Sequence, residues 1–109
     1  RQEEQQLYEY DEYKLQIRRL DFGKKRGIYE FSTYDPETKD TPPSWGLHPY
    51  AEVGVILEGK MEVNLDGTVY LLGPGDSIYI KPNLYHTMRN AGDTPCRSFW
   101  HLQIMDDSV

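Results

Sequence analysis

Three side chains of this sequence, two imidazoles and one carboxylate, could together hold a metal ion. His48 and Glu52 lie four residues apart, and His86 follows on the far side of a strand–turn–strand segment. Two histidines and one carboxylate with open coordination positions suit iron(II), manganese, nickel or zinc. Such an ion acts as a Lewis acid or as an oxygen activator. The sequence therefore predicts a candidate metal site at His48, Glu52 and His86.

This site can form only if the chain bends between His48 and Glu52. On a straight strand, residues four apart share a face but lie about 13 Å apart, at about 3.3 Å per residue. Metal ligands lie about 2.0–2.2 Å from the ion. Pro49 fixes its own φ and cannot donate to a central ladder, so we expect a bend at Pro49–Ala51. The alternative is a metal-free polar pocket, and a straight strand here would exclude the metal.

A second group of side chains could contact a small ligand in the same cavity. Aromatic rings pack against sugars or flat apolar ligands, with ordinary core packing as the alternative for each ring. A histidine on the last strand could offer a further metal ligand, or could be a hydrogen-bonded structural residue. The expected ligand-binding residues are Trp45, Tyr50, Tyr79, Tyr85, Phe99 and His101.

The elements that must position these residues are short strands joined by turns. Asp66-Gly67 is a two-residue hairpin signal. Regular strand–turn spacing without a helical period predicts an all-β fold, an antiparallel sandwich or barrel. Alternation of apolar and polar residues, or a short apolar run, marks the expected strands, which are 13–17, 29–33, 53–57, 61–65, 68–72, 77–80, 86–90 and 97–104.

Length and charge narrow the classes of function. A chain of 109 residues is long enough for one domain, with residues 1–12 as a flexible or arm-like segment and residues 13–109 as a single barrel. Its formal net charge of -6 argues against nucleic-acid binding. The sequence has no apolar run long enough to span a membrane and no signal-peptide pattern at its start, so we expect a cytoplasmic protein. The single cysteine, Cys96, excludes an internal disulfide and is expected to be a buried structural thiol.

Residues 46–59 resemble the first signature motif of the cupin superfamily. Glu52 lies seven residues before Gly59, as the family glutamate does, and His48 then matches the second histidine of that motif. Gly46 stands where the family has its first histidine.

The second motif is more complete. Gly75-Asp76, Pro82, His86 and Asn90 keep the family's order, with Asn83 where a glycine is common. The resemblance implies a jelly-roll barrel, also called a double-stranded β-helix, and a divalent metal with one ligand fewer than usual.

The resemblance leaves three kinds of function open. The runs 52–59, 75–80 and 89–100 look like the effector-binding cupin domains of bacterial transcriptional regulators, which implies a sensor of a sugar or small polar metabolite. The alternative is a small metal-dependent enzyme, a dioxygenase, isomerase or lyase, with Tyr50 or Tyr85 as a proton donor. A non-catalytic binding or storage protein is the third. The resemblance also implies a homodimer in which the strand Tyr13–Ile17 is exchanged.

Overall fold

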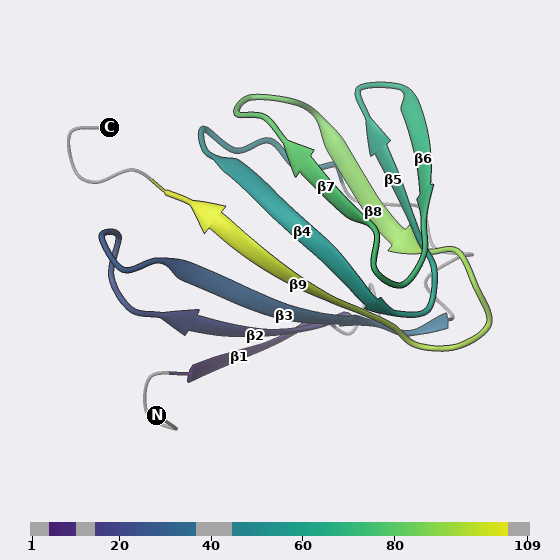
Figure 1. Cartoon of the computed structure of the whole chain (residues 1–109), viewed down its shortest axis with the longest axis horizontal. Helices are drawn as coiled ribbons and strands as arrows, with labels where there is room; N and C mark the ends of the chain where they lie inside the picture. The colour runs from purple at the N-terminus through teal and green to yellow at the C-terminus, as the bar shows by residue number, and fades with distance from the viewer. Residues whose placement is uncertain (1–4, 11–14, 37–44, 105–109) are drawn as a thin grey trace.

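The computed structural model describes residues 5–10, 15–36 and 45–104, and strands arranged in two sheets make up most of this part of the chain (Figure 1). The larger sheet has the order β1-β2-β3-β9-β4-β7, and the smaller has the order β6-β5-β8. The strands are β1 Gln5–Tyr10, β2 Leu15–Asp21, β3 Ile28–Tyr34, β4 Ala51–Glu58, β5 Met61–Leu65, β6 Thr68–Leu72, β7 Ser77–Ile80, β8 His86–Asn90 and β9 Cys96–Gln103.

All strand pairs in both sheets run antiparallel, which confirms the predicted all-β, jelly-roll class. The predicted hairpin at Asp66-Gly67 is present between β5 and β6. Asp66 has φ 48° and Gly67 has φ 101°, and a tight hairpin turn needs positive φ at both central residues. The described residues contain no helix long and apolar enough to cross a membrane.

Part of the segment expected to be flexible or arm-like is a strand where the structure describes it. Residues 5–10 form β1, which pairs with β2 in the register Gln5↔Leu20 to Tyr10↔Leu15. A polar segment can still form a strand when a neighbour offers a free row of backbone groups, as the edge of β2 does. Residues 1–4, 11–14, 37–44 and 105–109 lie outside the described part, so the exchanged strand stays a prediction.

The core lies between the two sheets and explains why β4 contains a glycine. Trp100, on β9, is buried beside Gly54 on β4, and the two residues are register partners. A Cβ added at Gly54 would lie 2.4 Å from two ring atoms of Trp100. The indole Nε1 donates to Oγ of Ser98 at 2.8 Å. Gly54 is therefore required so that the indole can lie against β4. The buried apolar residues around it include Ile28, Ile56, Met61, Val63, Ile80 and Leu102.

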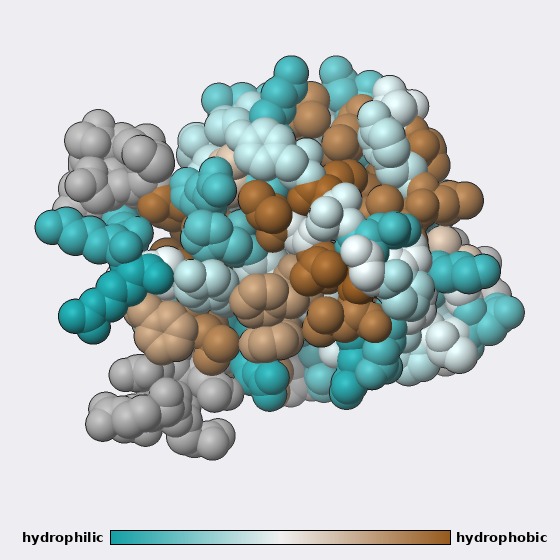
Figure 2. Space-filling view, viewed as in Figure 1, coloured by the Kyte–Doolittle hydropathy of each residue, from teal (hydrophilic) through white to brown (hydrophobic). Residues whose placement is uncertain are grey.

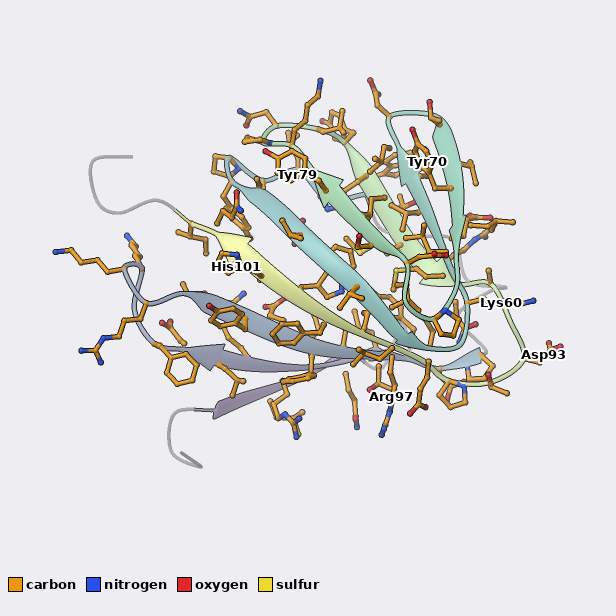
Figure 3. All side chains as sticks on the ribbon, in the orientation of Figure 1. Lys60, Tyr70, Tyr79, Asp93, Arg97 and His101 are labelled. Carbon is orange, nitrogen blue, oxygen red and sulfur yellow. The ribbon has the colours of Figure 1, made fainter. Side chains whose placement is uncertain are left out.

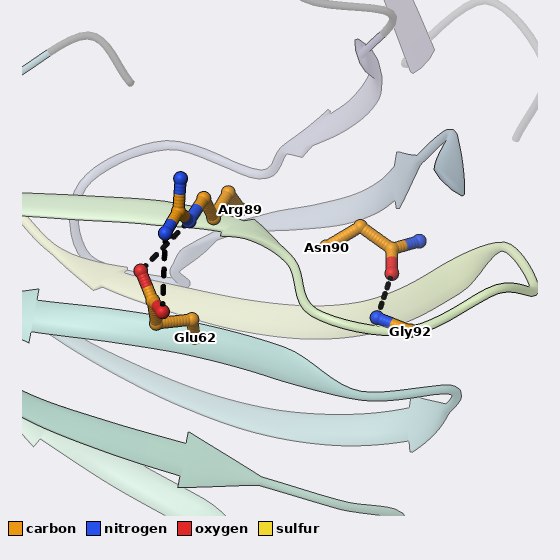
Figure 4. A network of polar contacts seen from close by, with 4 residues as sticks. All are labelled: Glu62, Arg89, Asn90 and Gly92. Carbon is orange, nitrogen blue, oxygen red and sulfur yellow. Dashed lines mark hydrogen bonds and ion pairs between the residues drawn. The ribbon is translucent and has the colours of Figure 1, made fainter. Parts of the chain in front are cut away.

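Asn90 connects the end of β8 to two other segments. Its Nδ2 donates to the carbonyl oxygens of Tyr34 and Thr94, at 2.9 and 2.8 Å, and its Oδ1 accepts from the backbone N of Gly92 at 2.7 Å. Figure 4 shows the last of these bonds beside the ion pair of Arg89 with Glu62. Because Asn90 is fully buried, its amide replaces water for these backbone groups.

Candidate metal centre

The chain bends where the sequence predicts, between the two candidate ligands of the first motif. Pro49 and Tyr50 form a bend, and β4 begins only at Ala51. The backbone N of Asn83 donates to the carbonyl oxygen of His48 at 2.7 Å, which ties this bend to the second motif. Asn83 has φ 60°, a left-handed conformation that asparagine and glycine tolerate best. The bend brings the side chain of His48 back toward that of Glu52.

A pair of backbone hydrogen bonds fixes Gly46 against His86. The N of Gly46 donates to the carbonyl oxygen of His86 at 2.8 Å, and the N of His86 donates to that of Gly46 at 3.1 Å. The first motif therefore continues the smaller sheet next to β8. This pairing carries His86 to the same place as His48.

The three predicted ligands converge on one spot. One ligand atom from each of His48, Glu52 and His86 can be chosen so that all three lie within 4.8 Å of one another. Glu52 is 7% exposed and His86 is 5% exposed, while His48 is half-buried. Glu52 faces the interior because its register partners on β9 and β7, Leu102 and Ile80, are buried core residues.

The ring of His86 is held so that one nitrogen faces the carboxylate. Its Nδ1 lies 2.9 Å from the carbonyl oxygen of Leu84, and a proton there can be donated to that oxygen. Nε2 then presents a lone pair toward Oε2 of Glu52, which is 3.3 Å away. Within the described residues, Oε2 accepts no hydrogen bond although it is buried. Two acceptors that face each other in a buried place call for a cation between them.

A proton or a metal ion could be this cation. The carboxylate of Glu52 raises the pKa of His86 above its ordinary value, against the opposing effect of burial. A divalent ion would satisfy the same two atoms and the ring of His48 as well. The contact from Nδ1 to the backbone is the kind of outer contact that orients metal-binding histidines. The donor set of two imidazoles and one carboxylate therefore fits a divalent transition metal.

Gly46 lies directly beside this cluster. A Cβ added there would lie 3.1 Å from Nε2 of His86 and 3.4 Å from Nε2 of His48. The first distance is shorter than ordinary contact, so a side chain at this position would crowd the atoms that could bind the ion. Gly46 therefore adds no side chain to the site.

Tyr50 is the one predicted ligand-binding residue that the structure places against the cluster. Its ring stacks on that of His48, with centroids 5.0 Å apart and planes at 17°. Burial and the nearby carboxylates of Glu52 and Glu30 raise the pKa of Tyr50. The phenol therefore stays protonated and can donate a hydrogen bond to a ligand.

Tyr79, Phe99 and His101 lie on the other side of the larger sheet, which corrects the expectation that they face the same cavity. Successive residues of a strand point to opposite faces. On β9 the buried side chains include Ser98, Trp100 and Leu102. Phe99 and His101 alternate with them and therefore point outward. Tyr79 is the register partner of Val53, whose neighbour Glu52 points inward.

Trp45 and Tyr85 are exposed and pack against each other rather than around the cluster. Their rings meet edge to face with centroids 6.5 Å apart. Each is a sequence neighbour of an inward-facing residue, Gly46 or His86. Whether the two rings contact a ligand stays a prediction. The described site consists of His48, Glu52 and His86, with Tyr50 and Gly46 beside them.

An interior ion pair was missed in the sequence. Nε and Nη2 of Arg19 donate to Oε2 of Glu30 at 2.9 and 2.6 Å, and Glu30 is buried. In the alternating pattern of residues 28–34, the buried set is Ile28, Glu30 and Ser32. From the sequence, the opposite set looks more like a buried face, because it contains Tyr29 and Phe31.

Comparisons with known proteins agree with this geometry. The cupin domain family model matches residues 30–102, more than half of the chain. Among curated proteins, the polyketide synthase CurC of Streptomyces cyaneus is 39% identical over 56 residues, which are 50% of this chain and 36% of CurC. Mannose-1-phosphate guanylyltransferase of Escherichia coli is 33% identical over 79 residues, 68% of this chain and 16% of the enzyme. The chain thus spans well under half the length of these relatives.

Solved structures share the fold at low identity. AerE from Microcystis aeruginosa has a TM-score of 0.79 at 16% identity, covering 94% of this chain and 46% of AerE. The Fe(II) form of HppE has a TM-score of 0.77 at 15% identity, covering 92% of this chain and 57% of HppE. The cupin domain of an XRE family transcriptional regulator from Enterobacter cloacae has a TM-score of 0.72 at 15% identity, covering 85% of this chain and 99% of that domain. With its two antiparallel sheets, its two motifs and the family match, this chain belongs to the cupin domain family.

Proposed function

We propose that this chain binds a divalent transition metal through His48, Glu52 and His86, and that the ion binds a small polar molecule such as a sugar or other metabolite. The observation that carries the proposal is the buried, unsatisfied Oε2 of Glu52, 3.3 Å from Nε2 of His86. A proton on Nε2 of His86 would satisfy this oxygen without an ion, so the ring of His48, whose nitrogen lies within 4.8 Å of both other ligand atoms, is what favours a metal. Three protein ligands leave coordination positions open, which a ligand donor atom can take.

The surrounding residues have separate roles in this proposal. The backbone carbonyl of Leu84 holds the ring of His86, and the hydrogen bond from Asn83 to the carbonyl of His48 holds the first motif. Tyr50 covers one side of His48 and offers a hydroxyl donor to the ligand. Gly46 adds no side chain beside the ring nitrogens of His48 and His86. When bound, the ion would supply Lewis acidity to an oxygen atom of the ligand.

A sensing role is the form of this proposal that we favour. The cupin domain of the Enterobacter cloacae regulator shares the fold over 85% of this chain. A domain of this size needs no catalytic group beyond the metal ligands in order to bind an effector.

A small metal-dependent enzyme, a dioxygenase, isomerase or lyase, is the second candidate. Tyr50 favours it, because a protonated phenol stacked on a metal-ligand histidine is placed to donate a proton to a bound substrate. HppE, solved with Fe(II), shares the fold. Turnover of a bound molecule that is lost in Tyr50→Phe, with metal binding intact, would favour the enzyme over the sensor.

Metal analysis of protein purified without a histidine tag tests the proposal. We expect about one ion per chain, lost in His86→Ala and retained in the control His101→Ala, because His101 points away from the site. A thermal-shift screen of sugars and small acids, with and without the ion, then tests ligand binding. Protein that binds no ion, or that retains it in His86→Ala, would overturn the metal site.

A further inference from the structure

The larger sheet carries charged side chains on its inward side and several aromatic rings on its outward side. Brown, apolar atoms gather over the middle of β4 and β9 in Figure 2, and Figure 3 labels Tyr79 and His101 on their strands. The inward side contains Glu30 and Glu52, which are the buried carboxylates among the described residues. The interior therefore offers charge where a plain core would offer hydrocarbon.

Glu30 forms an ion pair with Arg19 that stability alone does not explain. Glu30 is 8% exposed, and replacing a buried ion pair by apolar residues of similar volume is often neutral or stabilising. Nε and Nη2 of Arg19 both contact Oε2 of Glu30, at 2.9 and 2.6 Å. Oε1 of Glu30 takes no part in these two bonds. Arg19 thus holds the carboxylate in place, and Oε1 can accept a hydrogen bond from another molecule.

This ion pair lies on the same inward face as the candidate metal centre. The register partner of Glu30 on β9 is Trp100. That of Glu52 is Leu102, two residues further along the same strand. Two strand spacings of about 4.8 Å and a shift of two residues place the backbones of Glu30 and Glu52 about 12 Å apart. Because both side chains extend inward, a molecule of hexose size is long enough to reach from one carboxylate to the other.

Tyr50 lies near both charged groups. Its ring stacks on that of His48 at the metal centre. Burial raises the pKa of Tyr50 most, the carboxylates of Glu52 and Glu30 raise it further, and the guanidinium of Arg19 lowers it. Coulomb interactions weaken with distance, so all three charges lie near this phenol. Its hydroxyl is therefore placed to donate to a ligand that reaches from the metal centre toward Glu30.

The charge of these groups selects the ligand. Histidines bind a metal as neutral imidazoles. The carboxylates of Glu52 and Glu30 are then opposed by the guanidinium of Arg19 and by the two positive charges of a divalent ion, which leaves one net positive charge. Buried charges are stable when they are paired. A monoanion pairs the remaining charge, whereas a neutral sugar leaves it unpaired and a dianion exceeds it.

We infer that Glu30 is a further ligand-binding residue and that the ligand is a polyhydroxylated monocarboxylate. The carboxylate of the ligand binds the ion, and a hydroxyl at its other end donates to Oε1 of Glu30. A hydroxyl can donate to this oxygen, whereas an alkyl group or a second carboxylate cannot. The inference rests on the proposed function, because the ion holds one end of the ligand.

Isothermal titration calorimetry of the chain loaded with nickel tests this inference with four probes. Gluconate is the polyhydroxylated monocarboxylate. Sorbitol has its hydroxyls without the carboxylate, hexanoate has the carboxylate without the hydroxyls, and glucarate has a carboxylate at both ends. We expect gluconate to bind about tenfold or more tighter than each of the other three, because each of them lacks one of the two contacts.

A double variant, Arg19→Met with Glu30→Leu, removes the ion pair and keeps its volume, a kind of replacement that commonly preserves a fold. We expect it to bind nickel as the unaltered chain does and to bind gluconate about tenfold more weakly. The matched control is Arg89→Met with Glu62→Leu, which removes a 2.7 Å ion pair from the outward side of the smaller sheet. This control should keep the affinity for gluconate. Circular dichroism verifies that both variants are folded, and the four probes need no variant.

Two results would overturn the inference and leave the metal site standing. The first is a nickel-loaded chain that binds gluconate no more tightly than hexanoate, sorbitol or glucarate. The second is a folded double variant that binds gluconate as tightly as the unaltered chain. A chain that holds no ion would overturn the proposed function and this inference together, and metal analysis distinguishes that case from the other two.

Discussion

Nε2 of His86 and Oε2 of Glu52 face each other at 3.3 Å inside the barrel, and the carboxylate oxygen accepts no hydrogen bond from the described residues. The other nitrogen of the ring, Nδ1, is already directed at the carbonyl oxygen of Leu84. This arrangement leaves both facing atoms as acceptors when the imidazole is neutral. The metal proposal rests on that relationship.

Glu52→Gln should therefore weaken metal binding strongly. The amide keeps the shape of the side chain but removes its negative charge, and it places an NH₂ group or a neutral oxygen opposite His86. We expect metal affinity to fall by more than the roughly 10–100-fold that outer-shell changes cost. Isothermal titration calorimetry with a divalent ion measures this. The matched control is Glu58→Gln on the same strand, whose carboxylate is exposed and should not affect binding.

Gly46→Ala should lower metal or ligand affinity although it adds only one methyl group. The new Cβ would lie 3.1 Å from Nε2 of His86, closer than ordinary contact, and would crowd the atoms that could bind the ion. Gly73→Ala is the control, because its Cβ would meet only Oδ2 of Asp76 at 3.8 Å. Isothermal titration calorimetry with a divalent ion measures the affinity of both variants. Equal affinities in the two variants would show that crowding at Gly46 does not affect binding.

Gly54→Ala should destabilise the fold by about 1–3 kcal/mol, as overpacking of a core does. Its Cβ would overlap the ring of Trp100, so the indole would have to move. A loss of this size lowers Tm by about 4–8 °C per kcal/mol in a domain of about 100 residues. Thermal unfolding followed by circular dichroism measures it. A Tm equal to that of Gly73→Ala would contradict the close packing of Trp100 on β4.

Asn90→Ala should cost about 3 kcal/mol, because it removes three hydrogen bonds that a fully buried side chain makes to part-buried backbone groups. Urea unfolding gives the change in the free energy of unfolding. Asn64→Ala is a suitable comparison, since Asn64 accepts a single bond from the N of Gly67 in an exposed turn. We expect Asn90→Ala to lower the free energy of unfolding clearly more than Asn64→Ala does. The reverse order would contradict the connecting role of Asn90.

Cys96 should react slowly with iodoacetamide until the protein unfolds. The thiol is fully buried, and burial raises its pKa to about 11. Because the fold favours the neutral thiol, this contribution to stability is complete below the ordinary thiol pKa and is lost as pH rises toward about 11. Alkylation followed by mass spectrometry, with and without urea, measures the protection. Fast alkylation of the folded protein near neutral pH would contradict burial of the thiol.

The turns and the candidate metal ligands could be predicted because each depends on a short motif. Pro49 marks a bend, Asp66-Gly67 marks a hairpin, and the histidine and glutamate spacing marks a cluster. The two turn signals are carried by adjacent residues, whereas His86 stands far from Glu52 and joins it through the order of the two motifs; the structure has the bend, the hairpin and the cluster.

The face of each strand was harder to predict. On β9 both phases contain aromatic residues, with Phe99 and His101 in one and Trp100 in the other. On β3 the inward phase contains Glu30, whose burial is made tolerable by Arg19 on the neighbouring strand. Periodicity shows that alternate residues point to opposite faces of a strand. It does not show which of the two sets is buried when both faces are partly covered. The pairing of strands that are far apart in the sequence decides which set is buried, and the pattern of one strand does not show that pairing.

Anomalous diffraction from a crystal soaked in manganese or nickel tests the central claim most directly. The account predicts one strong anomalous peak per chain, about 2.0–2.2 Å from a ring nitrogen of His48, a ring nitrogen of His86 and a carboxylate oxygen of Glu52. The same soak of a Glu52→Gln crystal should give a weak peak or none. No peak between these three side chains in the unaltered protein, with the ion bound elsewhere or nowhere, would contradict the account.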